Sequence, residues 1–322
     1  MSAGERSSMT EPLVSIVLPC YNAQEWLGEA IRSALDQSYR RKEVIVIDDG
    51  STDASLEVIR SFGERIRWAT QQNRGGCAAR NRGMALAAGD YIQFLDADDV
   101  LSADKIEKQV RALLRLPPRS VAMCAWNHFT AADGHAPAAR CSFWKDYERG
   151  VDLLVDMWLD GGFFVPHCWL VPRRLALEAG RWNESLVADQ DGEFFGRVLV
   201  SAGAVAFVEG ACAHYRTPGK CNVSASMSAG AVESRFCAWE SVQHSLLSSR
   251  DDRTARRAVL RRLRAIIYSY ARHNAALLRR AAEHEARLRV SDFDPRMPPV
   301  IRYAVGMLGI RRGLQLRRLI KL

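Results

Sequence analysis

The stretch Tyr91-Ile-Gln-Phe-Leu-Asp-Ala-Asp-Asp99 decides the fold, because an apolar run ends abruptly there in three carboxylates. A short apolar run with polar residues at its end is typical of a buried strand. Two earlier runs share this pattern: Val14-Ser-Ile-Val-Leu18 is followed by Pro19, and Val44-Ile-Val-Ile47 by Asp48-Asp-Gly-Ser51. Polar or turn-forming residues therefore follow each of these expected strands.

Segments with helical spacing separate the expected strands. Apolar residues recur at helical intervals from Glu25 to Gln37, and we expect further helices after Ser51 or Thr52, over Gly76 to Ala88, and from Ser102 to about Leu116. Strands that alternate with helices of this length predict an α/β fold, with a mostly parallel sheet covered by helices on both faces. Ligands of such sheets bind beyond the carboxyl ends of the strands, where the acidic residues of this sequence gather.

Composition narrows the class of protein. With 48% hydrophobic and 25% charged residues, the 322-residue chain has the composition of a folded globular protein rather than a disordered one. Met1 to Pro12 lack the apolar core of a signal peptide, and the apolar stretch from Tyr303 to Ile310 is too short to span a bilayer. We therefore expect a cytoplasmic protein. The eight cysteines form no Cys-x-x-Cys pair, which predicts reduced thiols rather than a zinc knuckle or a disulfide framework.

The charge is unevenly placed along the chain. Residues 230–322 hold 20 Lys or Arg against 8 Asp or Glu, whereas residues 1–229 are mildly acidic. This division predicts a polar tail over 1–12, a catalytic domain over 13–229 with halves at 13–116 and 117–229, and a basic helical extension over 230–322. Basic and apolar residues are mixed after Asp294, which favours an anionic membrane surface on the cytoplasmic side. Self-association or packing on the protein's own core stays open, and nucleic acid is disfavoured because no binding motif is present.

Asp96 and Asp98 are candidate metal ligands. Two carboxylates at one strand end repel each other unless a cation neutralises them, and Mg²⁺ or Mn²⁺ binds such oxygens while keeping positions for phosphate. A helix start that is rich in acidic residues explains the same pattern. Residues alone leave both interpretations open.

Two other segments are also ambiguous when read by themselves. Asp49 can accept a hydrogen bond from a nucleobase beside Gly50, or belong to a tight turn. The stretch Asn73-Arg-Gly-Gly-Cys-Ala-Ala-Arg80 can bind an anion at a helix start, or form a solvated basic face. A nicotinamide enzyme is disfavoured, because Pro19-Cys-Tyr-Asn22 occupies the place of the required Gly-rich loop.

Five segments together resemble the family 2 glycosyltransferases, whose catalytic domain has the Rossmann-like GT-A fold. The matching text lies in Val14 to Ala23, Val44 to Asp53, Asn73 to Gly75, Ala79 to Gly83 and Gly89 to Asp99. The resemblance is close from Val14 to Leu116, looser to Arg216 and absent beyond.

The resemblance implies roles for individual residues. Pro19 and Tyr21 would border the nucleoside base and Asp49 would accept its N–H. Arg80 would lie near the diphosphate or ribose. Asp96 would lie by the ribose and the metal, and Asp98 would be the principal metal ligand.

The family's catalytic base corresponds to Asp191 in Gln190-Asp-Gly-Glu-Phe-Phe-Gly-Arg197. Asp191 would deprotonate the acceptor hydroxyl, which implies inversion at the anomeric carbon. Gln190 stands where the family usually has Glu, and Asp189 is a rival for the same role.

Several residues farther along are weaker candidates. Trp182 would line the acceptor site, Arg216 would touch phosphate, and His214 would reach the metal, although a buried core histidine is the favoured interpretation of His214. His167 and Trp169 are left as either core or site residues.

The resulting hypothesis is an inverting, metal-dependent transferase that moves a sugar from a UDP-sugar to a saccharide or lipid-linked acceptor in the synthesis of a cell-surface polysaccharide. Two alternatives are a nucleotidyltransferase acting on sugar phosphates and a non-catalytic nucleotide-binding membrane or assembly module. The first would need a Gly-rich basic loop after the first strand. The second would not need Asp49, Asp98 and Asp191 together.

Overall fold

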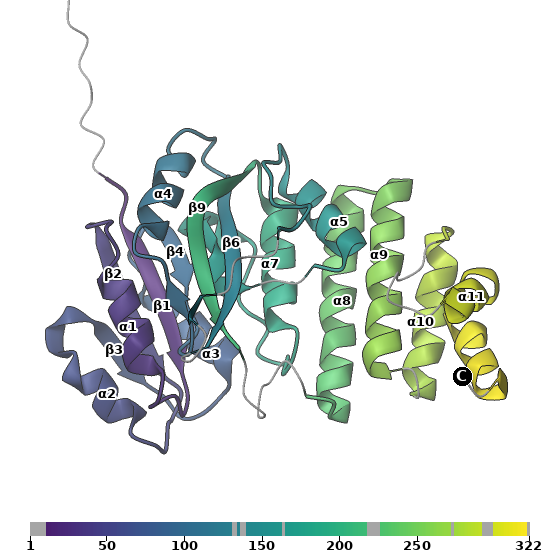
Figure 1. Cartoon of the computed structure of the whole chain (residues 1–322), viewed down its shortest axis with the longest axis horizontal. Coiled ribbons are helices and arrows are strands. Elements are labelled where there is room, and N and C mark those ends of the chain that lie inside the picture. The colour runs from purple at the N-terminus through teal and green to yellow at the C-terminus, as the bar shows by residue number, and fades with distance from the viewer. Residues whose placement is uncertain are drawn as a thin grey trace, which may run out of the picture.

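The structure is a computed structural model that describes residues 11–130, 134–135, 140–162, 165–217, 226–271, 274–291 and 299–320. The described residues form one nine-stranded sheet in the order β3-β2-β1-β4-β8-β6-β9-β5, with β7 paired to β6 (Figure 1). The strands are β1 (Val14–Cys20), β2 (Lys42–Asp48), β3 (Arg67–Thr70), β4 (Tyr91–Phe94), β5 (Val100–Leu101), β6 (Val121–Thr130), β7 (Gly134–His135), β8 (Trp169–Pro172) and β9 (Val205–Arg216).

The predicted parallel strands are confirmed in the first half of the sheet. β1 pairs in parallel with β2 and β4, and β2 with β3, so their carboxyl ends lie at one edge. Alternate side chains of a strand point to opposite faces of the sheet. In β1, Ile16 and Leu18 enter the core on one face and Val17 the core on the other. Burial on both faces explains why these strands are continuous apolar runs.

The second half of the sheet is mixed. β8 pairs antiparallel to both β4 and β6, whereas β6 and β9 run parallel. Because Ile92 of β4 lies opposite Val171 and β8 runs in the opposite direction, β8 begins near the carboxyl end of β4. The short 3-10 helix Pro166–Cys168, which precedes β8, is therefore placed beside the acidic loop that follows β4.

Helices cover both faces of the sheet, as the sequence predicts. Residues of α1, α2 and α4 pack in one core, and residues of α3, α5, α6 and α7 in the other. The helices of this part are α1 (Leu27–Leu35), α2 (Ser55–Ser61), the 3-10 turn Gly63–Arg65, α3 (Gly76–Leu86), α4 (Lys105–Leu113), α5 (Gly150–Asp160), α6 (Arg173–Glu178) and α7 (Gln190–Ser201).

Two helices begin a few residues later than predicted, and the serines expected at their starts do not cap them. α2 begins at Ser55, where Asp53 Oδ1 accepts the hydrogen bond from the backbone N–H, while Ser51 Oγ accepts one from Asn22. α4 begins at Lys105 and ends at Leu113, and the hydroxyl of Ser102 accepts a hydrogen bond from Cys212 of β9 instead. Both serines bind residues distant in sequence, which local capping patterns do not report.

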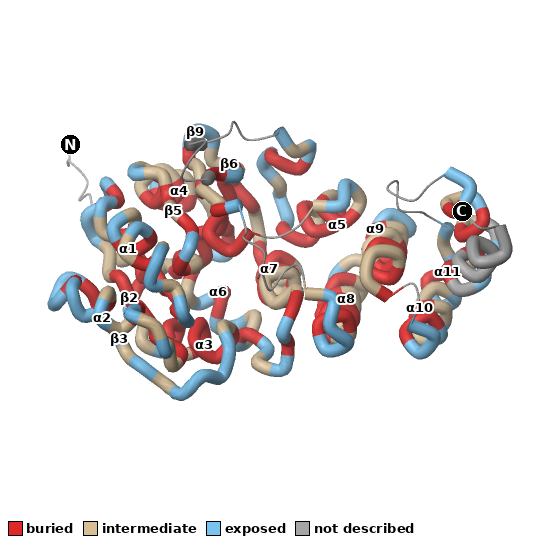
Figure 2. Tube along the Cα trace, turned by 60° about the horizontal axis from the view of Figure 1, so that its bottom comes forward, coloured by how far each residue is buried: buried red, intermediate tan, exposed pale blue. Residues whose placement is uncertain are grey.

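The helical extension is present as expected. It comprises α8 (Ala229–Ser249), α9 (Arg253–Ile266), the π-helical segment Ile267–Ala271, α10 (Ala275–Leu288) and α11 (Pro299–Ile320), which is kinked at Gly309. The helices stand side by side in a row that starts at α7 (Figure 1). Buried residues run along α7, α8 and α9 (Figure 2), and buried residues of α8 to α11 belong to the same core as those of α3, α5, α6 and α7. Among the described helices, none combines the length and the apolarity needed to cross a bilayer.

Seven of the eight cysteines lie in the described part of the chain, and no disulfide joins two of these seven. Cys221 lies outside the described residues.

Candidate active site

The loop that follows β4 carries three carboxylates in different environments. Asp96 is partly buried, Asp98 is exposed, and Asp99 is only 1% exposed. Burial, together with the charges of Asp98 and Asp96, raises the pKa of the Asp99 carboxyl well above its ordinary value. Desolvation by the surrounding protein and the charge of Asp96 raise the pKa of the Asp98 carboxyl as well. This loop thus concentrates negative charge that a bound cation would neutralise.

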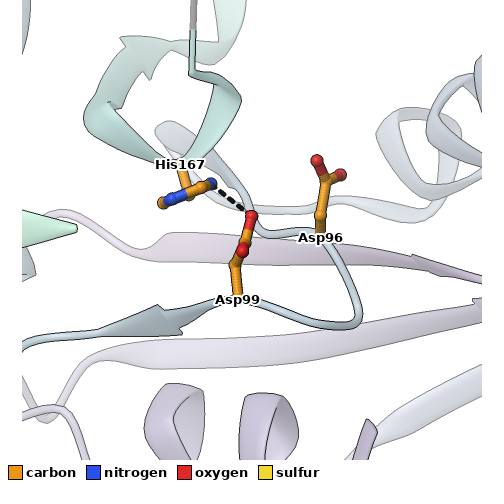
Figure 3. A group of neighbouring side chains, drawn as sticks. All are labelled: Asp96, Asp99 and His167. Atoms are coloured by element: carbon orange, nitrogen blue, oxygen red, sulfur yellow. Dashed lines mark ion pairs between the residues drawn. The ribbon is translucent and has the colours of Figure 1, made fainter. Parts of the chain in front are cut away.

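Asp96, Asp99 and His167 form a group that could hold a metal ion (Figure 3), because their ligand atoms all lie within 4.8 Å of one another. His167 is fully buried in the 3-10 helix before β8, and its Nδ1 lies 3.1 Å from Asp99 Oδ2. Burial lowers the pKa of the His167 imidazole to about 3, so the ring is neutral. A neutral imidazole and carboxylate oxygens are ligands that divalent cations accept.

Unsatisfied polar atoms test whether this group fits a cation. Asp99 Oδ2 and both ring nitrogens of His167 are buried and make no hydrogen bond of good geometry among the described residues, although Nδ1 and Oδ2 lie close to each other. Buried polar atoms without partners are uncommon and point to an absent ion or water. The three residues therefore fit a divalent cation. Asp98, the expected principal ligand, lies outside the group, so its role stays a prediction.

Arg80 connects the acidic loop to the start of α7. The guanidinium is 7% exposed; Nη2 donates to Asp96 Oδ1 at 2.6 Å, and Nη1 to Gln190 Oε1 at 3.4 Å. One face of it covers the ring of Trp182 at 4.7 Å. Gln190, which replaces the family's usual Glu, thus lies beside the Arg80 guanidinium, the group that the resemblance places near the diphosphate.

Asp191 and Asp189 differ in what surrounds them. Burial raises the pKa of the Asp191 carboxyl to about 7; Arg80 lowers it, while Asp96 and Asp189 raise it further. Asp191 Oδ1 is buried without a hydrogen-bond partner among the described residues. Asp189, the rival, is instead ion-paired to Arg262 of α9 at 3.0 Å. A carboxyl that titrates near neutral pH suits a general base, so these surroundings favour Asp191.

The expected nucleobase site lies at the ends of β1 and β2. Tyr21 is half exposed and Pro19 is partly buried, whereas Asp49 is buried. The Asp49 carboxylate accepts hydrogen bonds from Gln71 Nε2 and from the backbone N–H groups of Arg74 and Gly75, at 2.7 to 3.1 Å for the closest contacts. In this structure it therefore anchors the loop that leads into α3, and its contact with a base stays a prediction.

Trp182 and Trp169 belong to the core rather than to an exposed surface. Trp182 is 1% exposed and stacks on Phe194 with ring centroids 4.2 Å apart, and Trp169 is 3% exposed and stacks on Phe195. Trp182 also lies under the Arg80 guanidinium, and its place at the acceptor site stays a prediction. Aromatic rings of this size dominate the burial of apolar area in a core.

Arg216 and His214 contact other side chains near the acidic loop, and their expected roles at phosphate and metal stay predictions. The Arg216 guanidinium lies between the rings of Trp26 and Phe129, at 4.1 and 4.3 Å, and binds Glu29 and the carbonyl oxygen of Asp98. Arg216 therefore stabilises the acidic loop, because its backbone N–H also donates a hydrogen bond to Asp99 Oδ1. His214 Nδ1 lies 2.7 Å from Asn127 Oδ1 and is not a member of the metal-capable group among the described residues.

Comparison with known proteins adds sequence relatives to this geometry. The sequence model of glycosyl transferase family 2 matches residues 15–178, about half of the chain. An uncharacterized glycosyltransferase of Haemophilus influenzae is 48% identical over 111 residues, which are 33% of this chain and 44% of that protein. The putative teichuronic acid biosynthesis glycosyltransferase TuaG of Bacillus subtilis is 38% identical over 108 residues, 32% of this chain and 43% of that protein. These matches thus span less than half the length of either relative.

Solved structures share the fold. TarS of S. aureus, residues 1–349 in complex with UDP-GlcNAc, superposes with a TM-score of 0.66 at 16% identity, covering 86% of this chain and 80% of that one. The mannosyltransferase PcManGT of Pyrobaculum calidifontis, in complex with GDP-Man and Mn²⁺, gives 0.51 at 15% identity, with 86% and 74% covered. At these identities the likeness concerns the fold, and it confirms the GT-A architecture with additional C-terminal helices.

Proposed function

The chain belongs to glycosyl transferase family 2, and we propose that it is an inverting, metal-dependent transferase that uses a UDP-sugar. One observation carries the proposal: the metal-capable acidic loop, the Arg80 guanidinium and the Asp191 carboxyl, from three distant segments, act on one another electrostatically at one end of the sheet. A nucleoside diphosphate needs cationic partners, and an acceptor hydroxyl needs a base. This part of the molecule supplies both.

The metal part of the proposal concerns Asp96, Asp98, Asp99 and His167. When bound there, Mg²⁺ or Mn²⁺ supplies Lewis-acid stabilisation of the charge that develops on the leaving diphosphate. Arg80 adds a fixed positive charge at the same place, held by Asp96 in a partly buried ion pair. UDP is favoured as the leaving group because TarS has been crystallised with UDP-GlcNAc, although PcManGT shows the same fold with GDP-Man.

The base part concerns Asp191. In its ionised form the carboxylate removes the proton from the acceptor hydroxyl as the hydroxyl oxygen attacks the anomeric carbon. The bond from that carbon to the diphosphate breaks on the opposite side, so the configuration inverts. A single displacement needs one base and no nucleophile on the protein. The acceptor is proposed to be a saccharide or lipid-linked saccharide of a cell-surface polysaccharide, since TuaG is named for teichuronic acid synthesis.

Thermal denaturation with UDP tests the donor and metal parts. UDP with Mn²⁺ is expected to raise the melting temperature, because a ligand that binds the folded state stabilises it by mass action. Asp98→Ala and His167→Gln separate the two candidate ligand sets. If only Asp98→Ala loses the Mn²⁺-dependent rise, Asp98 is favoured as a ligand. If only His167→Gln loses it, the Asp96–Asp99–His167 group is favoured. No Mn²⁺-dependent rise in the unmodified protein would contradict the proposal.

Hydrolysis and transfer assays test the reaction. A panel of UDP-sugars is screened for Mn²⁺-dependent release of UDP, with and without candidate saccharide acceptors. The proposal expects release with at least one UDP-sugar and little release with GDP-sugars. Cleavage of a nucleoside triphosphate with a sugar 1-phosphate instead would favour the nucleotidyltransferase alternative.

We further propose that α11 contacts an anionic membrane surface. Val300, Tyr303 and Leu308 are exposed on this helix, with 54%, 72% and 44% of their areas accessible. Residues 299–322 contain six Lys or Arg and no Asp or Glu. Exposed apolar side chains in a segment of net positive charge suit the headgroup region of an anionic bilayer.

Sedimentation with vesicles tests this contact. Binding is expected to phosphatidylserine-containing vesicles, to weaken in high salt, and to fall in the double variant Val300→Ser with Tyr303→Ser. Equal binding to neutral vesicles would contradict the electrostatic part. A shift from oligomer to monomer in the double variant, without vesicle binding, would favour self-association instead.

A further inference from the structure

The segment that leads into α7 is bound by side chains from the helical extension. Residues 187–189 precede the first turn of α7, which carries Asp191. α8 packs beside α7, and α9 beside α8 (Figure 1). Two polar side chains, one from each of these helices, bind residues 187–189.

Ser234 of α8 uses its whole hydrogen-bonding capacity on this segment. Its Oγ accepts hydrogen bonds from the backbone N–H groups of Val187 and Ala188, at 3.0 Å each, and donates to the carbonyl oxygen of Ala188 at 2.7 Å. A hydroxyl has one donor and two acceptor positions, so all three are in use. Ser234 is 5% exposed, so its removal would leave backbone groups with little access to water.

Arg262 of α9 fixes the next residue. Asp189 has a φ of 57°, in the left-handed region that residues with a Cβ seldom adopt. Arg262 Nη2 donates to Asp189 Oδ2 at 3.0 Å, and the two side chains are 19% and 22% exposed. Gly192 permits the carboxylate to fold back, because a Cβ there would lie 2.5 Å from Asp189 Oδ1. Arg262, which lies outside α7, thus binds the side chain of the residue that has the uncommon backbone conformation.

A third contact continues along the same helix pair. Ser241 Oγ of α8 donates to Glu193 Oε1 at 2.7 Å, while Glu193 is also ion-paired to Arg197. Gly196 lets α8 approach, because a Cβ at that position would lie 2.7 Å from Val242. The first turns of α7 are therefore packed against the extension with little freedom to shift.

We propose that Ser234 and Arg262 are positioning residues for the transfer reaction, holding residues 187–189 so that Asp191 stays directed at the donor site. The helical extension is then part of the active site and not a module appended to it. This inference rests on the proposed role of Asp191 as the base.

Kinetic measurements on matched variants test the proposal. Ser234→Ala and Arg262→Gln are expected to lower kcat by about 10- to 100-fold, because small displacements of a catalytic group have effects of that size. The Kd of UDP with Mn²⁺ should change by less than about twofold, since transition-state effects need not alter ground-state binding. Arg262→Lys should recover most of the activity. Ser245→Ala on α8, whose hydroxyl donates to Ser241 within the helix, and Arg253→Gln at an exposed position of α9 are the controls.

Hydrogen–deuterium exchange provides a readout that does not depend on activity. Amides of residues 187–191 are expected to exchange faster in Ser234→Ala and Arg262→Gln than in the unmodified protein, while amides of β1 and β2 keep their protection. Circular dichroism confirms that each variant is folded.

The outcomes distinguish failure of the positioning role of Ser234 and Arg262 from failure of the proposed transferase function. Faster exchange with lower kcat and unchanged UDP binding supports the positioning role. Unchanged exchange at 187–191, or kcat within twofold of the unmodified protein, overturns it. If the unmodified protein transfers no sugar, the proposed function fails, and exchange at 187–191 alone then decides whether the two side chains hold the segment.

Discussion

Turnover is expected to follow the ionisation of Asp191. A general base works only when deprotonated, and burial places the pKa of this carboxyl at about 7. A cation bound beside Asp96 would offset one of the charges that raise this pKa, so the midpoint of the rate profile should lie at or below pH 7. The rate at saturating donor should therefore rise with pH and level off above the midpoint.

The size of the rise follows from the ionised fraction. A group with a pKa of 7 is about one tenth ionised at pH 6 and about nine tenths ionised at pH 8, so kcat should increase up to about tenfold over that interval. An unperturbed aspartate, with a pKa near 4, would give a flat profile over the same range.

Two substitutions should move the midpoint in opposite directions. Arg80 lowers the pKa of Asp191, so Arg80→Gln should move the midpoint to higher pH. Asp189 raises it, so Asp189→Asn should move the midpoint to lower pH, and the unpaired Arg262 would act in the same direction. Asn also tolerates the left-handed backbone found at position 189 better than most residues.

The assay is the initial rate of UDP release from pH 5 to 9 at saturating donor, acceptor and Mn²⁺. Arg262→Lys, which keeps a cation beside Asp189, is the control and should leave the midpoint in place. Midpoints that move in the same direction in Arg80→Gln and Asp189→Asn would refute the electrostatic reasoning. A flat profile would show that Asp191 does not limit the rate.

Three further outcomes are expected. Asp191→Asn should lower kcat by about 10²- to 10⁴-fold. Because the pKa of Asp191 is raised on folding, the folded protein holds a proton on this carboxyl between about pH 4 and 7 that the unfolded chain does not, so the stability of the unmodified protein falls as the pH rises through that window. At pH 8 the variant, which carries no charge there, should therefore be more stable in urea titrations by at most about 4 kcal/mol. Trp182→Ala should cost about 3–5 kcal/mol of unfolding free energy in urea titrations, because the ring is buried and stacked on Phe194. Gly83→Ala should cost about 1–3 kcal/mol, because the added Cβ would lie 2.3 Å from Val17 Cγ1, and an unchanged midpoint would show that α3 can shift away from β1.

Much of the sheet and part of the site could be predicted from the sequence. Buried parallel strands are continuous apolar runs with polar ends, so β1, β2 and β4 could be located, and their shared edge followed from topology. The family resemblance then placed Arg80, Asp96 and Asp191 at that edge, and the structure brings their charges into interaction.

The rest of the site depends on pairings that carry no local signal. His167 reaches the acidic loop only because β8 runs antiparallel to β4, and a histidine 68 residues after Asp99 gives no hint of that register. Trp182 is covered by Phe194, which follows in the next helix, so its burial also could not be read from its own segment. Likewise, Arg262 lies in an amphipathic helix and Ser234 in one without a clear apolar face, and neither sequence pattern distinguishes these positions from surface ones.

The row of helices from α7 to α11 would have a geometric consequence under the proposed contact of α11 with a membrane. Packed helices are spaced by roughly 8–10 Å, so four successive steps separate the helix with the base from the terminal one by roughly 30–40 Å. With α11 lying on a bilayer, the extension would act as a spacer of set length. Insertion or loss of a helix in this row would change the height at which a growing glycan on a lipid carrier meets the donor.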